Sequence, residues 1–298
     1  GQDVEVAAAS LATLRDAPRM VLSAVRIALD DARARRRGIP LHALYGERVR
    51  TRIRPYASSA GYVAGADLAA TWIAEATAAR DAGFAALKLR IGRGDAAREV
   101  EAIRVAVAAV DGFDWMADVN EAWSVETTRR HGPELAALGL RWLEEPMPAT
   151  DLPAYARVRG TLGLPVAGGE GSESPGRASA ALVAGAFDII QPDVSICGGL
   201  APLLTIAAAA GAQRVACIPH ACNGAINLAA TLQALAVLPP QAAAVEAGPL
   251  LEHDHGENPI RTDMLATPLV IREGWIDIPD GPGLGVEVVE RVVAALRA

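Results

Sequence analysis

The sequence predicts an α/β fold, a TIM-like (β/α)8 barrel in which eight parallel strands alternate with helices. The first observation is that short apolar runs alternate with alanine-rich amphipathic stretches from Thr51 onward, which is the pattern of parallel strands with crossover helices. The second is that acidic residues close three of these runs at positions 118, 144 and 170, in two equal steps. Each step is about the length of one strand, one helix and two short loops, so these residues are expected at one rim of the barrel.

Eight runs rich in apolar residues are the expected strands. They are Arg52–Ser58, Ala86–Arg90, Trp115–Asn120, Arg141–Pro146, Pro165–Glu170, Asp188–Asp193, Val215–His220 and Leu250–Asp254. The expected helices between them are Asp67–Ala82, Ala96–Ala109, Val125–Leu138, Leu152–Leu162, Ser174–Ala184, Gly199–Ala210 and Ile226–Leu238. Four glycines, Gly83, Gly139, Gly185 and Gly211, are expected to end helices in the left-handed conformation.

The two ends of the chain fall outside this alternation. Residues 1–50 contain one long expected helix, Met20–Arg37, and the barrel is expected over residues 51–262. Residues 263–298 form a tail in which Ile271–Ile276 is expected to make a strand, a turn and a second strand.

The composition is that of a chain with a large core and a mildly acidic surface. It has 298 residues, 51% of them hydrophobic, and 28 basic against 35 acidic residues give a net charge of −7. The acidity, and the lack of a basic run interleaved with aromatic residues, argue against nucleic acid as a partner. No uncharged apolar run is long enough for a membrane span. Three cysteines without a paired spacing and the lack of a signal-like start favour a reducing cytoplasm.

Asp118, Glu144 and Glu170 are the first candidate site residues. Three carboxylates that converge without a cation would repel one another and disfavour ionisation. A hard divalent cation removes that difficulty, and Mg²⁺ binds carboxylate oxygens. The sequence therefore predicts a Mg²⁺ site formed by these three residues.

Lys88 and Arg90 end the second expected strand with one residue between them, so the alternation of a strand points both side chains the same way. Two cations inside a barrel are costly to bury unless anions lie nearby, and the three carboxylates would supply those anions. If Arg90 lies close, its charge is expected to lower the pKa of the Lys88 ammonium. We interpret the pair as catalytic.

Asp193 and His220 end the sixth and seventh expected strands, which are neighbours in a barrel. A carboxylate hydrogen-bonded to an imidazole fixes its tautomer and raises its basicity, as a general base requires. Glu252 ends the last strand, where a protonated carboxyl would donate a hydrogen bond to an oxyanion. Glu246 is the alternative for that role.

Together these residues resemble a known family. The motifs are Lys88-Leu89-Arg90, Asp118-Val119-Asn120, Trp142-Leu143-Glu144-Glu145-Pro146, Gly169-Glu170, the run from Gln191 to Gly199, and His220. With them, nearly the whole chain from Met20 onward resembles the mandelate racemase subgroup of the enolase superfamily, especially its acid-sugar dehydratases. The resemblance implies a modified (β/α)7β barrel with a capping domain and Mg²⁺ bound by Asp118, Glu144 and Glu170. It also implies supporting roles for Asn120 and Glu145.

The resemblance gives the chain ends an interpretation. Residues 1–50 would be a helical remnant of the capping domain, and residues 263–298 would return to it. The antiparallel sheet with which that domain begins in the family is expected to be missing from this chain. Two residues also depart from parts of the family. Asp193 stands where the muconate-cycloisomerase branch carries a lysine base, and Arg90 stands where many relatives have a second lysine; a guanidinium is a poor proton acceptor.

The leading hypothesis is a Mg²⁺-dependent hydro-lyase that acts on a sugar acid. His220 would remove the proton α to the carboxylate, and loss of the 3-hydroxyl would give a 2-keto-3-deoxy acid. The enzyme alternative is a racemase or epimerase of a 2-hydroxy acid, with Lys88 as the second base. A metal-binding but catalytically silent barrel is a further alternative. The expected partners are a small sugar acid and, through alanine-rich helix faces, further copies of the chain in a homo-oligomer.

Overall fold

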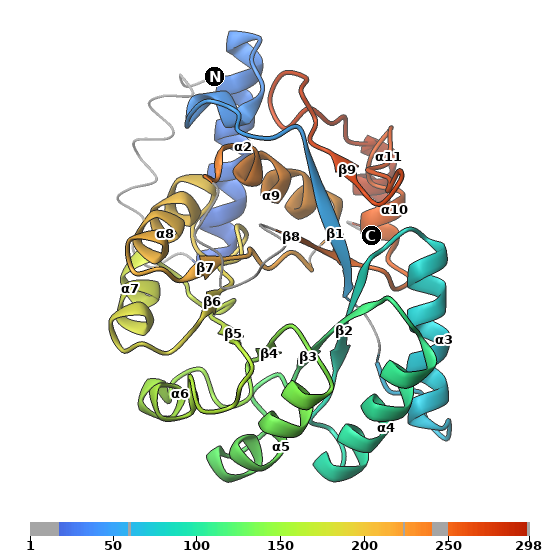
Figure 1. Ribbon diagram of the computed structural model, residues 1–298. Helices are drawn as coiled ribbons and strands as arrows, with labels where there is room; N and C mark the ends of the chain where they lie inside the picture. The colour runs from blue at the N-terminus through green and yellow to red at the C-terminus, as the bar shows by residue number, and fades with distance from the viewer. Residues whose placement is uncertain (1–17, 59–60, 223, 240–249, 297–298) are drawn as a thin grey trace.

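The computed structural model of the protein describes residues 18–58, 61–222, 224–239 and 250–296. Its centre is a curled sheet of eight parallel strands with helices around the outside, as Figure 1 shows. The strands lie side by side in the order β7–β6–β5–β4–β3–β2–β1–β8. The predicted TIM-like α/β fold is therefore confirmed.

The strands match the expected runs, but several are shorter. They are β1 (Arg52–Ser58), β2 (Ala86–Arg90), β3 (Asp114–Asp118), β4 (Leu143–Glu144), β5 (Val166–Gly168), β6 (Ile189–Ile190), β7 (Ala216–Cys217) and β8 (Leu250–Asp254). Strands β1, β2 and β8 have the predicted bounds. Strands β3 to β7 end earlier than predicted, because the chain leaves the hydrogen-bonded ladder at or before the polar residues that close each run.

The helices that cover the sheet are α3 (Leu68–Asp81), α4 (Ala96–Ala109), α5 (Val125–Ala137), α6 (Leu152–Val158), α7 (Pro175–Val183), α8 (Leu200–Ala212) and α9 (Ala225–Val237). The first five begin after an Asp or Ser whose side chain accepts a hydrogen bond from an amide of the first turn; these are Asp67, Asp95, Ser124, Asp151 and Ser174. Such caps satisfy amides that a helix start leaves unpaired. Helices α8 and α9 begin after Gly199 and Gly224 instead.

Three of the four predicted glycine positions at helix ends are confirmed. Gly83, Gly139 and Gly185 have φ angles of 91°, 79° and 67°, in the left-handed region that glycine enters without steric cost. The prediction for Gly211 is wrong. Helix α8 continues through it to Ala212, and Arg214 takes the left-handed conformation with φ of 58°.

One apolar layer fills the inside of the barrel. Its members come from all eight strands or the residues beside them and are Tyr56, Ala86, Met116, Trp142, Ala167, Ile189, Ala216, Ile218 and Leu250. Side chains alternate along a strand, so a residue two positions further on points the same way, one level nearer the carboxyl end. Lys88, Asp118, Glu144 and Glu252 therefore lie directly above this layer, and all four are buried. We call these four residues the polar layer.

The two ends of the described chain meet beside the barrel. Helix α2 (Arg19–Arg37) is followed by the short helix η1 (Leu41–Leu44), and the C-terminal segment contains α10 (Pro259–Thr262), β9 (Ile276–Asp277) and α11 (Glu290–Ala295). Arg35 Nη1 lies 2.8 Å from Glu287 Oε1, and the Leu284 amide donates to Asp31. The division into residues 1–50, 51–262 and 263–298 stays a prediction, which this contact supports.

The C-terminal segment also contacts the barrel through β9, which pairs antiparallel with β1. Just before it, Arg272 and Trp275 form an isolated antiparallel bridge around a turn at residues 273–274. The predicted turn is thus present and leads into β9, but the first predicted strand is reduced to this single bridge. No helix in the described part of the chain is both long and apolar enough to cross a membrane.

Candidate active site

The candidate site is built on the carboxyl ends of the strands. Asp118 and Glu144 are the last residues of β3 and β4 and face each other in the ladder register. Glu170, Asp193 and His220 lie two or three residues beyond β5, β6 and β7, on the connections that leave the same ends of the strands. The barrel thus brings together residues that are far apart in the sequence.

Lys88 is the central cation of the polar layer. Its Nζ atom lies 2.8 Å from Glu252 Oε1 and 3.9 Å from Asp118 Oδ2, and it donates a hydrogen bond to Glu144. Burial by itself would lower the pKa of Lys88, but the charges of Glu144 and Glu252 outweigh burial and hold the pKa well above its ordinary value. The overall shift is therefore upward, although the charge of a nearby Arg90 by itself would lower this pKa.

Arg90 lies at the edge of the polar layer. Its Nη1 atom is 3.2 Å from Asp118 Oδ2, and its side chain keeps about a third of its surface exposed, at 31%. Lys88 is fully buried, so Arg90 is the cation of the pair that solvent reaches.

Burial and repulsion between carboxylates disfavour ionisation of Asp118 and Glu170. The pKa of Asp118 is raised to about 7, mainly by burial and then by Glu144. Burial also raises the pKa of Glu170, and Glu144 adds to that effect. Asp118 Oδ2 is buried and accepts no hydrogen bond from the described residues. Lys88 and Arg90 therefore do not fully compensate the negative charge of Asp118 and Glu170.

This donor set fits a divalent cation in its chemistry. It offers hard carboxylate oxygens from consecutive strands, with one buried oxygen that lacks a hydrogen bond. As they stand, however, no three Asp, Glu, His or Cys side chains among the described residues are arranged to hold a metal ion. Lys88 already occupies one oxygen of Glu144, so a cation would enter only with a shift of these side chains.

Asp193 and His220 form the predicted pair. His220 Nδ1 lies 2.7 Å from Asp193 Oδ2, while Nε2 lies 3.3 Å from Glu170 Oε2. Burial would lower the pKa of His220, but the charges of Glu252 and Glu170 and the hydrogen bond to Asp193 raise it to about 10. The imidazole is therefore cationic at neutral pH in this arrangement.

Glu252 is ionised rather than protonated. Burial would raise its pKa, but Lys88 and His220 outweigh burial and lower the pKa below its ordinary value. Its Oε2 atom accepts a hydrogen bond from the Ala221 amide at 3.2 Å. The expected role of Glu252 as a protonated hydrogen-bond donor is therefore contradicted in this state of the site. Glu246 lies outside the described residues.

Asn120 and Glu145 lie in the loops that follow β3 and β4, next to Asp118 and Glu144. Both have positive φ angles, 49° and 37°, a conformation that is costly for residues other than glycine and that clusters at functional sites. The Asn120 amide donates to Asp118 Oδ1 at 2.9 Å. Glu145 is buried, and its pKa is raised to about 8 by burial and by Glu170. Their predicted supporting roles stay predictions.

Several contacts in the site were not predicted. Gln191 Nε2 and Trp142 Nε1 both donate to Glu144 Oε2, at 2.7 and 3.1 Å. Ser195 and Asn227 donate to Asp193. Strand alternation would have found Gln191, which lies two positions before Asp193. Asn227 lies inside a helix, so no strand pattern marks it.

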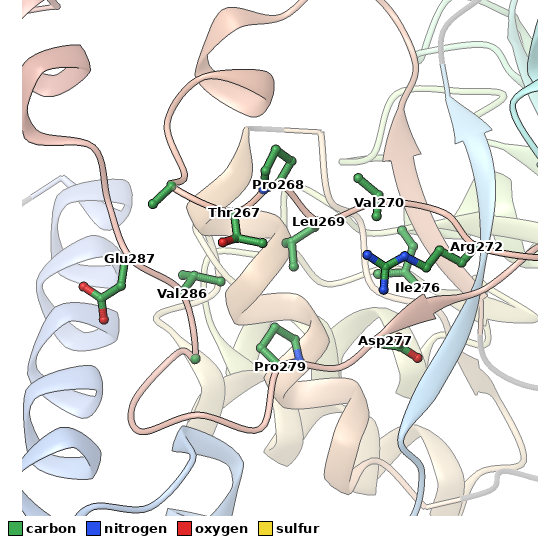
Figure 2. A pocket seen from close by; sticks show the side chains of 12 residues that line it. Thr267, Pro268, Leu269, Val270, Arg272, Ile276, Asp277, Pro279, Val286 and Glu287 are labelled. Carbon is green, nitrogen blue, oxygen red and sulfur yellow. The ribbon is translucent and has the colours of Figure 1, made fainter.

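A separate hollow lies in the C-terminal segment. This cavity has a volume of about 330 Å³. In Figure 2, Arg272 extends over an apolar wall that includes Leu269 and Ile276. Glu287 lies at its edge and contacts Arg35 of α2. None of its lining residues belongs to the polar layer, so the hollow takes no part in the candidate active site.

Comparison with known proteins gives consistent matches over most of the chain. Residues 71–292 match the family described as "Enolase C-terminal domain-like". The chain is 36% identical over 279 residues to D-galactarolactone cycloisomerase of Agrobacterium fabrum, covering 93% of this chain and 73% of the relative. It is 29% identical to L-talarate/galactarate dehydratase of Salmonella typhimurium, covering 91% of this chain but only 63% of the relative.

A solved structure agrees with these sequence matches. A member of the enolase superfamily from Polaromonas sp. JS666 superposes with a TM-score of 0.83 at 31% identity, covering 98% of this chain and 77% of that one.

Proposed function

The chain belongs to the enolase superfamily, in its mandelate racemase subgroup, and from this premise we propose that it is a Mg²⁺-dependent acid-sugar dehydratase. The observation that carries the proposal is the arrangement of His220 and Lys88. His220, held by Asp193, follows β7, and Lys88, held by Glu144 and Glu252, lies on β2. In the strand order they therefore flank β3 to β5, whose ends carry the acidic residues. One basic group and one fixed cation are what removal of a proton beside a carboxylate requires.

The chain's own residues would divide the work as follows. Arg90, which is partly exposed, and Lys88, which is buried beside it, would bind the substrate carboxylate and stabilise the negative charge that develops on it. His220 Nε2 would accept the α-proton as the bond between carbon and hydrogen breaks. The same proton would then pass to the 3-hydroxyl, which leaves as water. The resulting enol would tautomerise to the 2-keto-3-deoxy acid.

Mg²⁺ held by Asp118, Glu144 and Glu170 would bring a fixed positive charge to the substrate carboxylate and so favour loss of the α-proton. Enolase-superfamily sites combine a Lys or His base with one or two Mg²⁺ ions. A cation bound by Glu170 would also offset the negative charge of Glu170, which is one of the charges that raise the pKa of His220. The pKa of His220 would then fall, and the neutral imidazole that a base must provide would be favoured.

A cycloisomerase is the second candidate, because the 36% identical relative bears that name. With a sugar lactone, the same α-proton removal would expel the ring oxygen instead of a hydroxyl. The ring would open and the product would keep the mass of the substrate. The racemase alternative is less well supported, since the fully buried Lys88 has a raised pKa and is held as a charged ammonium rather than as a second base.

Mass spectrometry separates these reactions. The protein with Mg²⁺ would be incubated with galactarate, D-galactonate, D-gluconate and galactarolactone, and keto products would be trapped with semicarbazide. A dehydratase gives a product lighter by one water, and a cycloisomerase gives an isomer. If no compound changes while Mg²⁺ binds, the catalytically silent barrel replaces our proposal. His220→Asn serves as the control.

We also propose a cytoplasmic homo-oligomer that acts on small sugar acids. The support is the alanine-rich helix surface and the names of the dehydratase relatives. Light scattering during size-exclusion chromatography tests the oligomeric state, and a monomeric mass at micromolar concentration would contradict it.

A further inference from the structure

The Asp193 carboxylate is held at both of its oxygen atoms. Oδ2 lies 2.7 Å from His220 Nδ1. Oδ1 accepts hydrogen bonds from the Ser195 amide at 2.7 Å, from Ser195 Oγ at 2.6 Å and from Asn227 Nδ2 at 2.8 Å. Asp193 has no exposed surface, so these contacts replace the water that would otherwise solvate it. The orientation of the carboxylate is therefore set by protein groups.

The donors at Oδ1 come from two different places. Ser195 lies two residues after Asp193, so its hydrogen bonds fix the carboxylate relative to its own loop. Asn227 lies in the first turn of α9, the helix that follows β7, and His220 lies on the connection between that strand and that helix. Asn227 and His220 thus hold opposite oxygens of Asp193 from the same strand–helix unit.

Asn227 is suited to this contact by its position and burial. Helix α9 begins after Gly224, whose φ is 97° and where an added Cβ would lie 2.7 Å from Ile260 Cγ2. The close approach packs the start of α9 against α10, and Asn227, in the first turn, is buried. Its amide group donates to the carboxylate, and its Oδ1 atom is buried without a hydrogen bond from the described residues. The donor contact with Asp193 is thus the polar interaction that the structure assigns to this side chain.

We propose that Asn227 is a positioning residue for proton transfer at His220. By holding Asp193 Oδ1, its side chain keeps Oδ2 turned toward His220 Nδ1. That hydrogen bond fixes the plane of the imidazole and leaves Nε2 directed toward Glu170, 3.3 Å away. The catalytic consequence rests on the proposed function, because it assumes that His220 moves a proton.

The test compares two substitutions on the same helix. Asn227→Leu keeps a similar volume and removes the donor. Thr231→Val is the matched control: Thr231 lies one turn further along α9, is also buried, and its hydroxyl has no hydrogen bond from the described residues. General disturbance of α9 would appear in both variants, whereas loss of the Asp193 contact would appear in one.

The first readout needs no substrate. In ¹H–¹⁵N spectra tuned to histidine rings, the Nδ1 proton of His220 should be shifted downfield by its bond to Asp193. The signal is assigned among the five histidines by its loss in His220→Asn. We expect it to persist in Thr231→Val and to move upfield or vanish in Asn227→Leu. A signal unchanged in Asn227→Leu, or absent from the wild type, overturns the proposal.

The second readout is the rate with galactarate and D-galactonate. Hydrogen bonds to charged groups contribute enough that their loss should lower kcat by about 10- to 100-fold. KM should change little, because Asn227 contacts Asp193 and is not one of the residues proposed to bind the substrate carboxylate. An equal kcat in Asn227→Leu and wild type contradicts the catalytic part. If the wild type turns over neither acid, the proposed function fails, and the spectra still decide whether Asn227 positions His220.

Discussion

Lys88 Nζ lies 2.8 Å from Glu252 Oε1, and neither side chain is reached by solvent. A lone buried ammonium or carboxylate is expensive, whereas a pair whose remaining hydrogen-bonding atoms are also satisfied is tolerated. Glu252 Oε2 accepts from the Ala221 amide, and Lys88 also donates to Glu144. The contact therefore ties β2 to β8, the two strands that flank β1, and keeps both groups ionised.

This contact predicts that Lys88 is charged well above neutral pH. Lys88 is the only lysine of the chain, so ¹³C-labelled lysine gives a single side-chain signal whose titration reports its pKa. We expect the pKa above the ordinary lysine value because of Glu144 and Glu252. A folded pKa raised in this way stabilises the protein below the unfolded value, and the stability is lost as pH rises through the folded pKa. A titration below the ordinary value would restore Lys88 as a second base.

Replacing Lys88 by Met should destabilise the protein and stop turnover. The change keeps much of the side-chain volume but leaves Glu144 and Glu252 buried without this cation. Breaking a buried ion pair on one side costs about 3–5 kcal/mol. Urea unfolding with and without Mg²⁺ measures the loss, and Arg104→Met is the control because its pair with Glu101 lies on the exposed surface of α4. Equal stability losses in the two variants would contradict the argument.

Mg²⁺ should bind at Asp118, Glu144 and Glu170 with micromolar to millimolar affinity and near-octahedral geometry. An anomalous map from a crystal soaked in Mn²⁺ should place the ion among these three carboxylates, with Lys88 displaced from Glu144. Asp118→Asn should weaken binding measured by calorimetry. Density beside His253 and His255 would contradict the prediction. That site is the relevant alternative because burial, and then Arg261, lower the pKa of His253 to about 4, which keeps its imidazole in the neutral form that binds metals.

The fold and most of the candidate site follow from local rules of the sequence. Alternation along β2 and the equal steps between Asp118, Glu144 and Glu170 place these side chains without any knowledge of tertiary contacts. The ionisation of Glu252 could not be predicted in this way, because it depends on Lys88 approaching from another strand. The same holds for Asn227, whose contact with Asp193 depends on how closely α9 approaches the site.

His220→Asn should abolish turnover and leave the fold intact, since asparagine fills part of the space but cannot accept the proton. Loss of a general base lowers rates by about 10²–10⁴-fold, and loss of the sole base should cost at least that. Circular dichroism and Mg²⁺ calorimetry, compared with the wild type, establish that the variant is folded and binds the ion. Full activity in this variant would move the role of the base to Lys88.

Proton transfer should occur on one face of the substrate. His220 lies on one side of the acidic residues and carries the imidazole that can exchange a proton, while Arg90 and Lys88 on the other side are held as cations by Asp118, Glu144 and Glu252. A guanidinium does not act as a base near neutral pH, and the raised pKa of Lys88 keeps its ammonium protonated. Sugar acids of one α-configuration should therefore be dehydrated, and D₂O should place deuterium only from the His220 side. Comparable turnover of both α-epimers, with deuterium in each, would show two working bases and replace the dehydratase with a racemase or epimerase.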